Sequence, residues 1–156
     1  MPIYLKFDGV DGDITAEGHE KWIELQSVQW GSSRNVSTSG DAGQRTKSAV
    51  QMREVVVTKD RDSASGKLWK EHLIGEAKDV EIVWVTQSQG GQTIYQGLKL
   101  KNVLVSSFSS SGHASDRPVE QLSFNFTEIE GTFYDMAAKG TTTSKPFVQS
   151  YNLSKG

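Results

Sequence analysis

The chain has 156 residues, a formal net charge of −2 and no cysteine. A chain of this length suits one domain with its own hydrophobic core, and the lack of cysteine excludes a disulfide framework and thiolate chemistry. The slightly negative charge argues against nucleic acid as a partner, because phosphate binding needs a basic face. No apolar run approaches the ~18 residues of a membrane-spanning helix, so membrane insertion is not expected.

The N-terminal segment predicts a strand, because Ile3, Leu5 and Phe7 alternate with their neighbours as in a half-buried strand. It has no apolar centre of the kind found in signal peptides, so we expect a protein made in the cytoplasm. Secretion would then need a route that does not read an N-terminal signal. The Asp/Gly-rich residues 8–13 predict an acidic turn, and the spacing of a calcium-binding EF-hand loop is not met there.

Residues 22–31 predict a second strand with an irregularity. The apolar positions change phase between Leu25 and Val28, so we expect a β-bulge near Gln26–Ser27. The polar segment Ser32–Ser48 follows as an extended loop, and loops of this length are usually functional or disordered. Two interpretations remain for it: a flexible connection, or an arm that docks on another subunit.

A strand, one short helix and a further strand come next. Val50–Lys59 has the β-branched residues of a strand, and helical spacing predicts a helix over about 62–74 that ends at Gly75. The N-cap candidates are Asp60, Asp62 and Ser63, and the expected buried stripe is Leu68, Trp69 and Leu73. His72 is interpreted as a partly buried packing residue. Val80–Thr86 predicts a strand covered on both faces, with the helix over one of them.

Tyr95–Phe126 predicts a long antiparallel hairpin that forms the middle of the core. Its two alternating segments are joined by the Ser/Gly-rich residues 106–116, which predict a soft polar loop. The expected apolar face is Leu98, Leu100, Leu122, Phe124 and Phe126. The opposite face of the second segment is polar and consists of Gln121, Ser123, Asn125 and Thr127.

The last predicted strand, residues 129–136, contains Gly131, which predicts a bulge or bend. Residues 137–156 predict a polar C-terminal tail that docks irregularly through a few apolar residues. The expected fold is mainly β, with residues 1–156 forming a single domain. We expect a small antiparallel β-barrel or tight two-sheet sandwich with one short α-helix.

No catalytic or metal-binding pattern is present in the sequence. The three histidines, His19, His72 and His113, form no metal-ligand pair at helical spacing. No nucleophile elbow, phosphate-binding loop or dinucleotide fingerprint occurs. The glutamates fall mostly at solvent-facing strand positions, where an opposed catalytic pair is not expected. We therefore expect no enzyme activity, no catalytic residues, and neither cofactor nor metal.

Short motifs follow one another in a characteristic order. They lie in the stretches IYLKFDGVDGDITAEGHEKWIELQSVQWG and NVLVSSFSSSGHASDRPVEQLSFNFTEIEGTFY. These contain a D-G-D turn, the H-E-K-W-I-E entry into the second strand, W-G before the long loop, V-L-V-S-S and S-D-R-P. From residue 3 to about 134, this order and spacing resemble the Hcp family, the tube protein of the bacterial type VI secretion system. The 32–48 loop departs from one common form of the family by having less glycine.

The resemblance implies homohexameric rings that stack into a tube within a contractile sheath. It also implies a spike protein at the tip, small effector proteins in the lumen, and synthesis in the bacterial cytoplasm followed by secretion without a signal peptide. The implied contacts between rings or subunits lie in the 32–48 loop, at Arg34, Asn35, Gln44, Arg45 and Lys47. The polar strand face, Gln121, Ser123, Asn125 and Thr127, becomes a candidate lumen or subunit surface.

Two other classes of protein share parts of this pattern. A tail-tube or baseplate-like protein of a phage-related contractile particle has the same architecture, and its genomic neighbours distinguish it. A carbohydrate-binding β-sandwich exposes an aromatic platform and is monomeric or dimeric. Here the four tryptophans are expected at core or strand-edge positions: Trp22, Trp30, Trp69 and Trp84.

Overall fold

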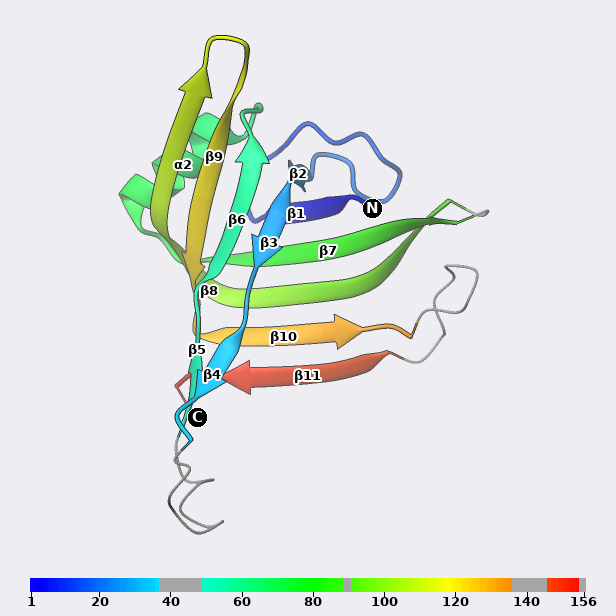
Figure 1. The fold of residues 1–156 in the computed structure, drawn as a ribbon, viewed down its shortest axis with the longest axis vertical. Helices are drawn as coiled ribbons and strands as arrows, with labels where there is room; N and C mark the ends of the chain where they lie inside the picture. Colours follow the sequence, from blue (N-terminus) through cyan, green and yellow to red (C-terminus); the bar gives the residue numbers. More distant parts are fainter. Residues whose placement is uncertain (37–48, 89–90, 136–145, 155–156) are drawn as a thin grey trace.

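The computed structural model describes residues 1–36, 49–88, 91–135 and 146–154. In these residues two antiparallel sheets share one long strand, β8 (Gly91–His113) (Figure 1). Sheet A contains β2 (Ile23–Leu25), β1 (Ile3–Phe7), β7 (Lys78–Ser88), the first part of β8, β10 (Glu128–Phe133) and β11 (Phe147–Asn152), in spatial order. Sheet B contains the second part of β8, β9 (Asp116–Asn125), β6 (Val55–Asp60) and β3 (Ser27–Gln29). This mainly β architecture confirms the predicted fold class.

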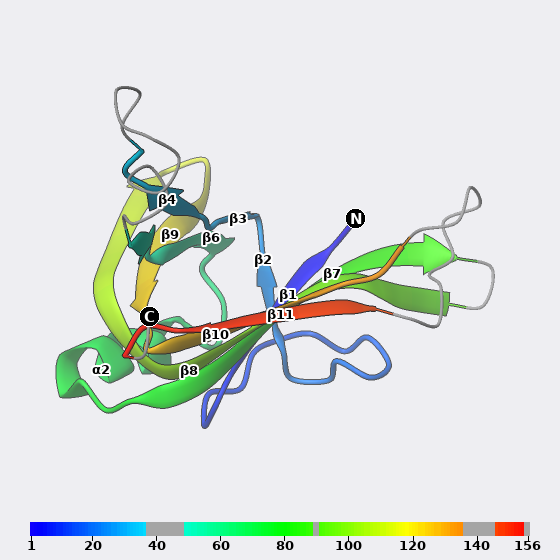
Figure 2. The same ribbon diagram turned by 90° about the horizontal axis from the view of Figure 1, so that it is seen from below.

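The two sheets cross at a steep angle, and smaller elements extend from them. In Figure 1 the long strands of sheet A run roughly horizontally, while those of sheet B run roughly vertically. Figure 2, seen from below, shows sheet B lying on one side of sheet A. A two-stranded ribbon, β4 (Ser32–Arg34) and β5 (Val50–Met52), continues β3 and β6 beyond sheet B, and the helix α2 (Ser65–Ile74) lies beside β8.

β8 passes from one sheet to the other at a corner around Asn102. Its residues up to Val103 pair with β7, and its residues from Leu104 pair with β9. Asn102 has a φ of 55°, a left-handed conformation that asparagine adopts more readily than most residues. Its side-chain amide donates to Thr127 Oγ1 at 2.9 Å, and the Thr127 N–H donates to the Lys101 carbonyl at 3.1 Å. Asn102 therefore bends the strand and ties the corner to the segment after β9.

A second corner lies between β2 and β3. β2 pairs with β1 in sheet A, whereas β3 pairs with β6 in sheet B. The irregularity predicted near Gln26–Ser27 is present, but it is a change of sheet rather than a bulge. Gln26 holds this corner, because its N–H donates to the Thr58 carbonyl and its side-chain amide donates to Asp60 Oδ1, both at 2.7 Å. The apolar phase changes because the two halves face the same core from different sheets.

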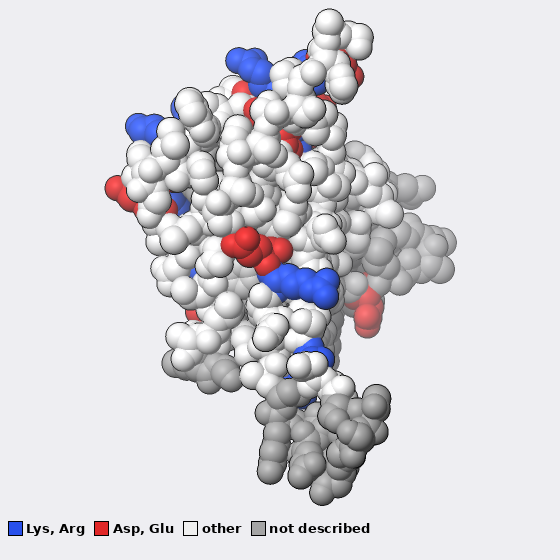
Figure 3. Space-filling view, turned by 60° about the vertical axis from the view of Figure 1, so that its left-hand side comes forward, with Lys and Arg blue, Asp and Glu red and all other residues white. Residues whose placement is uncertain are grey.

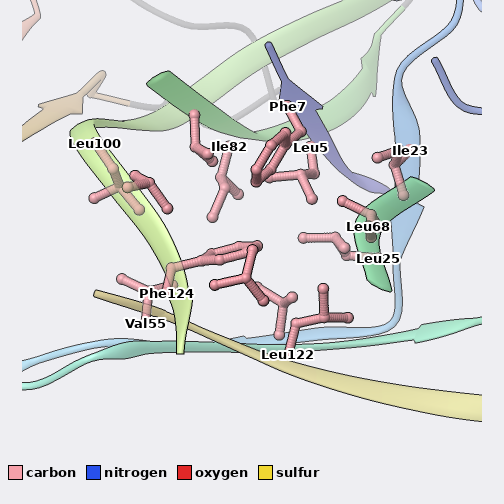
Figure 4. Packing of buried hydrophobic residues seen from close by; sticks show 14 of the residues in the cluster. Leu5, Phe7, Ile23, Leu25, Val55, Leu68, Ile82, Leu100, Leu122 and Phe124 are labelled. Atoms are coloured by element: carbon pink, nitrogen blue, oxygen red, sulfur yellow. The ribbon is translucent and has the colours of Figure 1, made fainter. Parts of the chain in front are cut away.

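The core between the sheets consists of the apolar residues that alternate along their strands. In Figure 4, Phe7 and Ile82 of sheet A face Leu122 and Phe124 of sheet B, and the rings of Phe7 and Phe124 have centroids 6.2 Å apart. The predicted apolar face is buried at every position: Leu98, Leu100, Leu122, Phe124 and Phe126. The first two belong to sheet A, because β8 bends before it meets β9.

α2 closes one end of the core and begins three residues later than predicted. Its N-cap is Ala64, which makes no side-chain cap hydrogen bond. Asp62, one of the predicted caps, still accepts the Ala64 N–H on its Oδ1 at 3.0 Å and so supports the turn before the helix. The helix ends at Gly75 as predicted, since glycine adopts the required φ of 73° without strain from a Cβ.

The predicted buried stripe of α2 is wrong at two of its three positions. Leu68 is fully buried, but Trp69 and Leu73 are exposed. The helix packs against β8 near the corner, where His72 Nδ1 forms a 2.7 Å hydrogen bond with the Val105 carbonyl. His72 is partly buried, which confirms its predicted packing role. The adjacent face of the helix is left in solvent.

The strand over Val80–Thr86 is buried on both faces from Ile82 onward, as predicted, but α2 is not its second cover. A small apolar cluster on the far face of sheet A consists of Tyr4, Val83 and Val85, with Ile14, Ala16, Trp22 and Ile94 packed against it. The loop between β1 and β2 therefore occupies the place that we expected for the helix.

Three segments predicted as irregular contain strands. Ser106–His113 continue β8 and pair with β9, so the predicted loop shrinks to the turn at residues 114–115. The first residues of the predicted 32–48 loop, Ser32–Arg34, form β4. Within the predicted tail, Phe147–Asn152 form β11, which pairs with every residue of β10. Backbone pairing with a neighbouring strand compensates for their polar composition.

The bulge predicted at Gly131 is also wrong. β10 runs through this residue in continuous register with both β8 and β11. The glycine instead leaves room for an aromatic ring, because a Cβ there would lie 2.9 Å from Phe133 Cε2. Gly131 therefore lets the Phe133 ring fold back over its own strand.

A buried ionic cluster joins sheet B to the start of α2. Lys59 is completely buried, with its ammonium 2.8 Å from Glu120 Oε1 and 2.9 Å from Asp62 Oδ1. The ammonium also lies 3.1 Å from Ser65 Oγ and 2.9 Å from the Asp60 carbonyl. Because acceptors surround the ammonium, its charge is compensated in the interior.

Candidate functional site

The outer face of sheet B carries mostly uncharged polar side chains. Residues paired across neighbouring strands lie on the same face, which gives this polar face of sheet B its members. They are Ser27 and Gln29 on β3, Val56 and Thr58 on β6, Leu104, Ser107, Ser109 and Ser111 on β8, and Val119, Gln121, Ser123 and Asn125 on β9. Charges occur at one end, where Arg117 lies 3.9 Å from Asp60. Figure 3, which brings the α2 and β8 side forward, shows broad areas without charged side chains.

Three of the four residues predicted on the polar strand face lie together on it. Gln121 and Asn125 are exposed, and Ser123 between them is partly buried. Thr127 lies beyond the end of β9, where its hydroxyl accepts the hydrogen bond from Asn102. Thr127 therefore belongs to the corner between the sheets rather than to the polar face.

The β8 half of the polar face has no clear signature in the sequence. Ser107, Ser109 and Ser111 fell in the segment predicted as a loop, yet they pair with Ser123, Gln121 and Val119 of β9. The available signal was the alternation of serine with Phe108 in an otherwise polar run. Without knowledge of β9 as a partner, that alternation is too weak to indicate a strand.

Both edges of sheet B are open within the described residues. There β3 pairs only with β6, and the second part of β8 pairs only with β9. At the β8 edge α2 occupies one position, through the hydrogen bond between His72 and the Val105 carbonyl. An open edge presents backbone N–H and C=O groups that can pair with a strand of another chain.

The outer face of sheet A differs from that of sheet B because it carries alternating charges. Lys6 pairs with Glu81, Glu81 with Lys99, and Lys99 with Glu130, in one row across four strands. Opposite charges across neighbouring strands attract each other weakly at a solvated surface, by about 0.2–1 kcal/mol per pair. One row further along, Lys101 pairs with Glu128. The part of this face beside the Tyr4–Val83–Val85 cluster is thus charged, whereas the outer face of sheet B is mostly uncharged and polar.

The structure places two of the five predicted loop contacts. Arg34 is exposed at the end of β4, and Asn35 follows it at the surface. Gln44, Arg45 and Lys47 lie outside the described residues. The β4–β5 ribbon itself extends away from the two sheets (Figure 1).

The described part of the chain offers little for catalysis. Among the described residues, no group of three or more His, Cys, Asp or Glu side chains is placed to hold a metal ion. The closest acid–base cluster, around Lys59, is buried and fully engaged in hydrogen bonds. At the surface, a side-chain hydrogen bond from Ser63 lowers the pKa of Asp13, with a smaller contribution from the Ser63 backbone N–H at 3.2 Å. This contact links the β1–β2 loop to the turn before α2.

No helix in residues 1–36, 49–88, 91–135 or 146–154 is long and apolar enough to cross a membrane. Comparisons with known proteins relate the chain to one family. The family model described as "Type VI secretion system effector, Hcp" matches residues 4–133, whereas no curated protein sequence matches.

Solved structures share the fold over nearly the whole chain. One described as a type six secretion system protein is 28% identical with a TM-score of 0.90, covering 99% of this chain and 96% of that chain. Hcp1 from E. coli EAEC 042 is 22% identical with a TM-score of 0.77, covering 98% and 99%. Hcp1 from Salmonella typhimurium is 21% identical with a TM-score of 0.73, covering 99% and 95%.

The region matched by the family model runs from β1 to β10 and includes α2 and every strand of the two sheets except β11. This match also agrees with the order of motifs noted in the sequence, from the D-G-D turn to S-D-R-P. The chain therefore belongs to the Hcp family, the structural tube proteins of the type VI secretion system.

Proposed function

We propose that this protein forms homohexameric rings in which the polar face of sheet B lines the central hole. The rings stack into a tube that a contractile sheath expels, with a spike protein at its tip and small effector proteins in its lumen. The observation that supports this arrangement most directly is a mostly uncharged polar face whose two edge strands pair with no further strand among the described residues.

The strand directions in sheet B allow the sheet to continue from one copy to the next. Each of its four strands is antiparallel to its neighbour, so the two edge strands, β8 and β3, run in opposite directions. The β8 edge of one copy beside the β3 edge of the next would form another antiparallel pair with the polar face on the same side. An interface between two different edges is heterologous, and it closes into a ring when the rotation per copy fits.

The chemistry of the polar face suits a surface along which other proteins travel. Hydroxyl and amide groups form hydrogen bonds with water and with cargo of either charge sign, and Gln121, Ser123 and Asn125 supply them on β9. A strongly charged wall would retain cargo of the opposite sign. The charged row of sheet A then faces outward, toward the sheath.

The remaining assignments follow from the family and from the position of each element. Arg34, Asn35, Gln44, Arg45 and Lys47 make polar contacts between rings or subunits, and this assignment is supported by the β4–β5 ribbon, at whose end Arg34 is exposed. The 156 residues act as one domain without enzyme activity. Secretion proceeds through the type VI apparatus and uses no N-terminal signal.

The ring is tested by native mass measurement and negative-stain electron microscopy of the purified protein. We expect a mass of six chains and particles with a central hole. A monomer or an isologous dimer at micromolar concentration, under conditions where the chain is folded, would contradict the proposal.

The orientation of the polar face is tested by site-specific labelling. Because the chain has no cysteine, Gln121→Cys and Lys99→Cys each introduce one reactive thiol, on the polar face and on the charged face respectively. A gold-maleimide label at position 121 should appear in the central hole, and one at position 99 at the outer rim. The reverse pattern would show that sheet A lines the hole.

A further inference from the structure

The loop that follows β1 contains two aspartate–glycine pairs, Asp8–Gly9 and Asp11–Gly12. Both aspartates are exposed, and the proposed function uses neither. An aspartate followed by glycine can react with its own backbone, when the glycine nitrogen attacks the carbon of the side-chain carboxyl group. Because both groups belong to the same short segment, their encounter depends only on the local geometry. The structure of the loop therefore decides whether each pair reacts.

The reaction has two steps and needs only water. In the first step the glycine nitrogen bonds to the protonated side-chain carboxyl group, whose hydroxyl leaves with the amide proton as water, and a cyclic succinimide forms. In the second step water opens the ring. Opening at the side-chain carbonyl restores aspartate. Opening at the backbone carbonyl leaves the chain running through the side chain, which is isoaspartate, with the same atomic composition as the original residue.

The turn at the end of β1 leaves Asp8 and Gly9 free to approach each other. The Val10 N–H donates to the Phe7 carbonyl at 3.0 Å, so Asp8 and Gly9 are the two central residues of a β-turn. Gly9 has a φ of 82°, and a Cβ built on it would meet nothing within 4 Å. Within the described residues, neither the Gly9 N–H nor the Asp8 carboxylate has a hydrogen-bond partner. The peptide between them can rotate at little steric cost.

The second pair, Asp11–Gly12, is held in place. The Gly12 N–H donates to the Lys21 carbonyl at 2.7 Å, so the nitrogen that would attack is already engaged. A Cβ on Gly12 would overlap the Trp22 carbonyl and lie 2.7 Å from Ile23 Cγ1. Rotation of the peptide between Asp11 and Gly12 would break the hydrogen bond and move the backbone in this crowded space. The first step of the reaction is therefore hindered here.

We propose that Asp8–Gly9 is a site of succinimide and isoaspartate formation in the folded protein, and that the fold protects Asp11–Gly12. The inference concerns a single chain and does not depend on the proposed ring. It gives the acidic turn after β1 a chemical property that its sequence alone does not determine, because both pairs have the same two residues.

Isoaspartate at position 8 would disturb the end of β1. It adds one carbon to the backbone of a turn whose two ends, Phe7 and Val10, are buried in the core. The Asp8 N–H also donates to the Asp79 carbonyl of β7 at 3.2 Å. The longer backbone cannot keep the turn, the core positions and this hydrogen bond unchanged together. Protein that has reacted should therefore unfold at lower denaturant than fresh protein.

The test follows isoaspartate in the purified protein during several weeks at neutral pH and physiological temperature. An isoaspartyl carboxyl methyltransferase with a radiolabelled methyl donor measures the total amount. Mass-spectrometric fragmentation of the tryptic peptide 7–21, which contains both pairs, assigns the position. The variant Asp8→Ser removes the proposed site, and Asp11→Ser is its matched control. Native protein incubated in concentrated urea shows how the two pairs react without the fold.

We expect isoaspartate to accumulate several-fold faster at position 8 than at position 11 in the folded protein. Methyl incorporation should fall strongly in Asp8→Ser and stay unchanged in Asp11→Ser. In urea the two positions should react at similar rates, because the protection of Gly12 is lost.

Three results would overturn the proposal. The first is a folded protein that forms no isoaspartate at position 8, and the second is equal accumulation at positions 8 and 11. The third is a preference for position 8 that persists unchanged in urea, since the neighbouring residues rather than the fold would then set the rates. None of these results bears on ring formation, so the proposed function is tested separately.

Discussion

Lys59 and Asn102 stabilise two junctions of the fold, the contact of sheet B with the start of α2 and the corner of β8. Neither role could be predicted from the sequence. Lys59 continues the inward alternation of Val55 and Val57, but a lysine at the end of a strand is usually exposed. Lys59 can be buried because Asp62, Ser65 and Glu120 surround its ammonium group. Asn102 lies within an alternating run that predicts a straight strand, and its positive φ depends on contacts with Thr127, 25 residues later. Sequence periodicity indicates which residues face the core, but it does not show which residues far apart in the chain will contact each other.

Removal of the Lys59 charge should destabilise the protein strongly. Lys59→Met fills a similar volume but leaves Glu120 buried without its cation, and breaking a buried ion pair in this way costs about 3–5 kcal/mol. Urea denaturation of the variant and the native chain measures the difference. Lys99→Met, at an exposed position of sheet A, is the matched control and should change the stability little. A similar small effect for both would show that the cluster contributes little to the fold.

Substitutions at Asn102 should separate backbone strain from the hydrogen bond. Asn102→Val places a β-branched residue at a φ of 55°, and such strain costs about 1–3 kcal/mol. Asn102→Gly accepts the conformation and loses only the contact with Thr127. We expect the valine variant to unfold at clearly lower denaturant than the glycine variant. Equal midpoints would mean that the corner does not need the left-handed conformation.

At the scale of elements, the alternation of apolar and polar residues correctly predicted the core strands. It did not predict the strands that depend on backbone pairing with a neighbour. The five predicted core positions, four on β8 and β9 and Phe126 directly after β9, are buried because their two-residue period matches the strand. The serine-rich end of β8 and most of β11 have no such pattern, and they are strands because β9 and β10 supply their hydrogen bonds. A helical pattern likewise predicted α2 itself, but the direction of its buried face depends on where it meets β8. Contacts with the rest of the fold bury Leu68 and partly bury His72, and they leave Trp69 exposed to solvent.

Residues 41–47, in the segment that joins β4 to β5, should matter for assembly rather than for folding. Deletion of Asp41–Lys47 removes three of the five predicted contact residues and leaves every strand of the two sheets in place. We expect an unchanged denaturation midpoint for the isolated protein and weaker stacking of rings into tubes, measured by light scattering and electron microscopy. A deletion of equal length within a sheet would remove a strand and cannot serve as a control. The unchanged denaturation midpoint therefore shows that the deletion leaves the fold intact. Tubes of normal length from the deleted protein would contradict the assignment.

At the scale of the molecule, the shared strand makes the two sheets one structural unit. β8 contributes hydrogen bonds to β7 and β10 on one side of the corner and to β9 on the other. Neither sheet can separate from the other without breaking this strand. The sequence predicted the mainly β class of this fold. It could not predict the number of copies in a ring, because that depends on the rotation between copies and not on the pattern within one.

Core substitutions in either sheet should therefore lower the stability of both. We expect Phe124→Ala in sheet B to cost about 3–5 kcal/mol and Ile82→Ala in sheet A about 2–5 kcal/mol, because each leaves a cavity in the common core. Each variant should still unfold in one transition, with coincident curves from tryptophan fluorescence and far-ultraviolet circular dichroism. Two separated transitions in either variant would show that the sheets unfold independently.

The pairing of β1 with β7 has a consequence for biosynthesis. These two strands are about 80 residues apart in the chain, and a ribosome that adds ~5–20 residues per second needs roughly 4–16 s to make that length. During this time β1 can pair only with β2, its other edge has no partner, and the apolar residues of these strands have no second sheet to pack against. Nascent chains in this state expose unpaired strand edges and apolar side chains, which favour aggregation. Chaperone binding during translation should therefore concentrate on the first half of the chain and end once β7 to β9 have emerged.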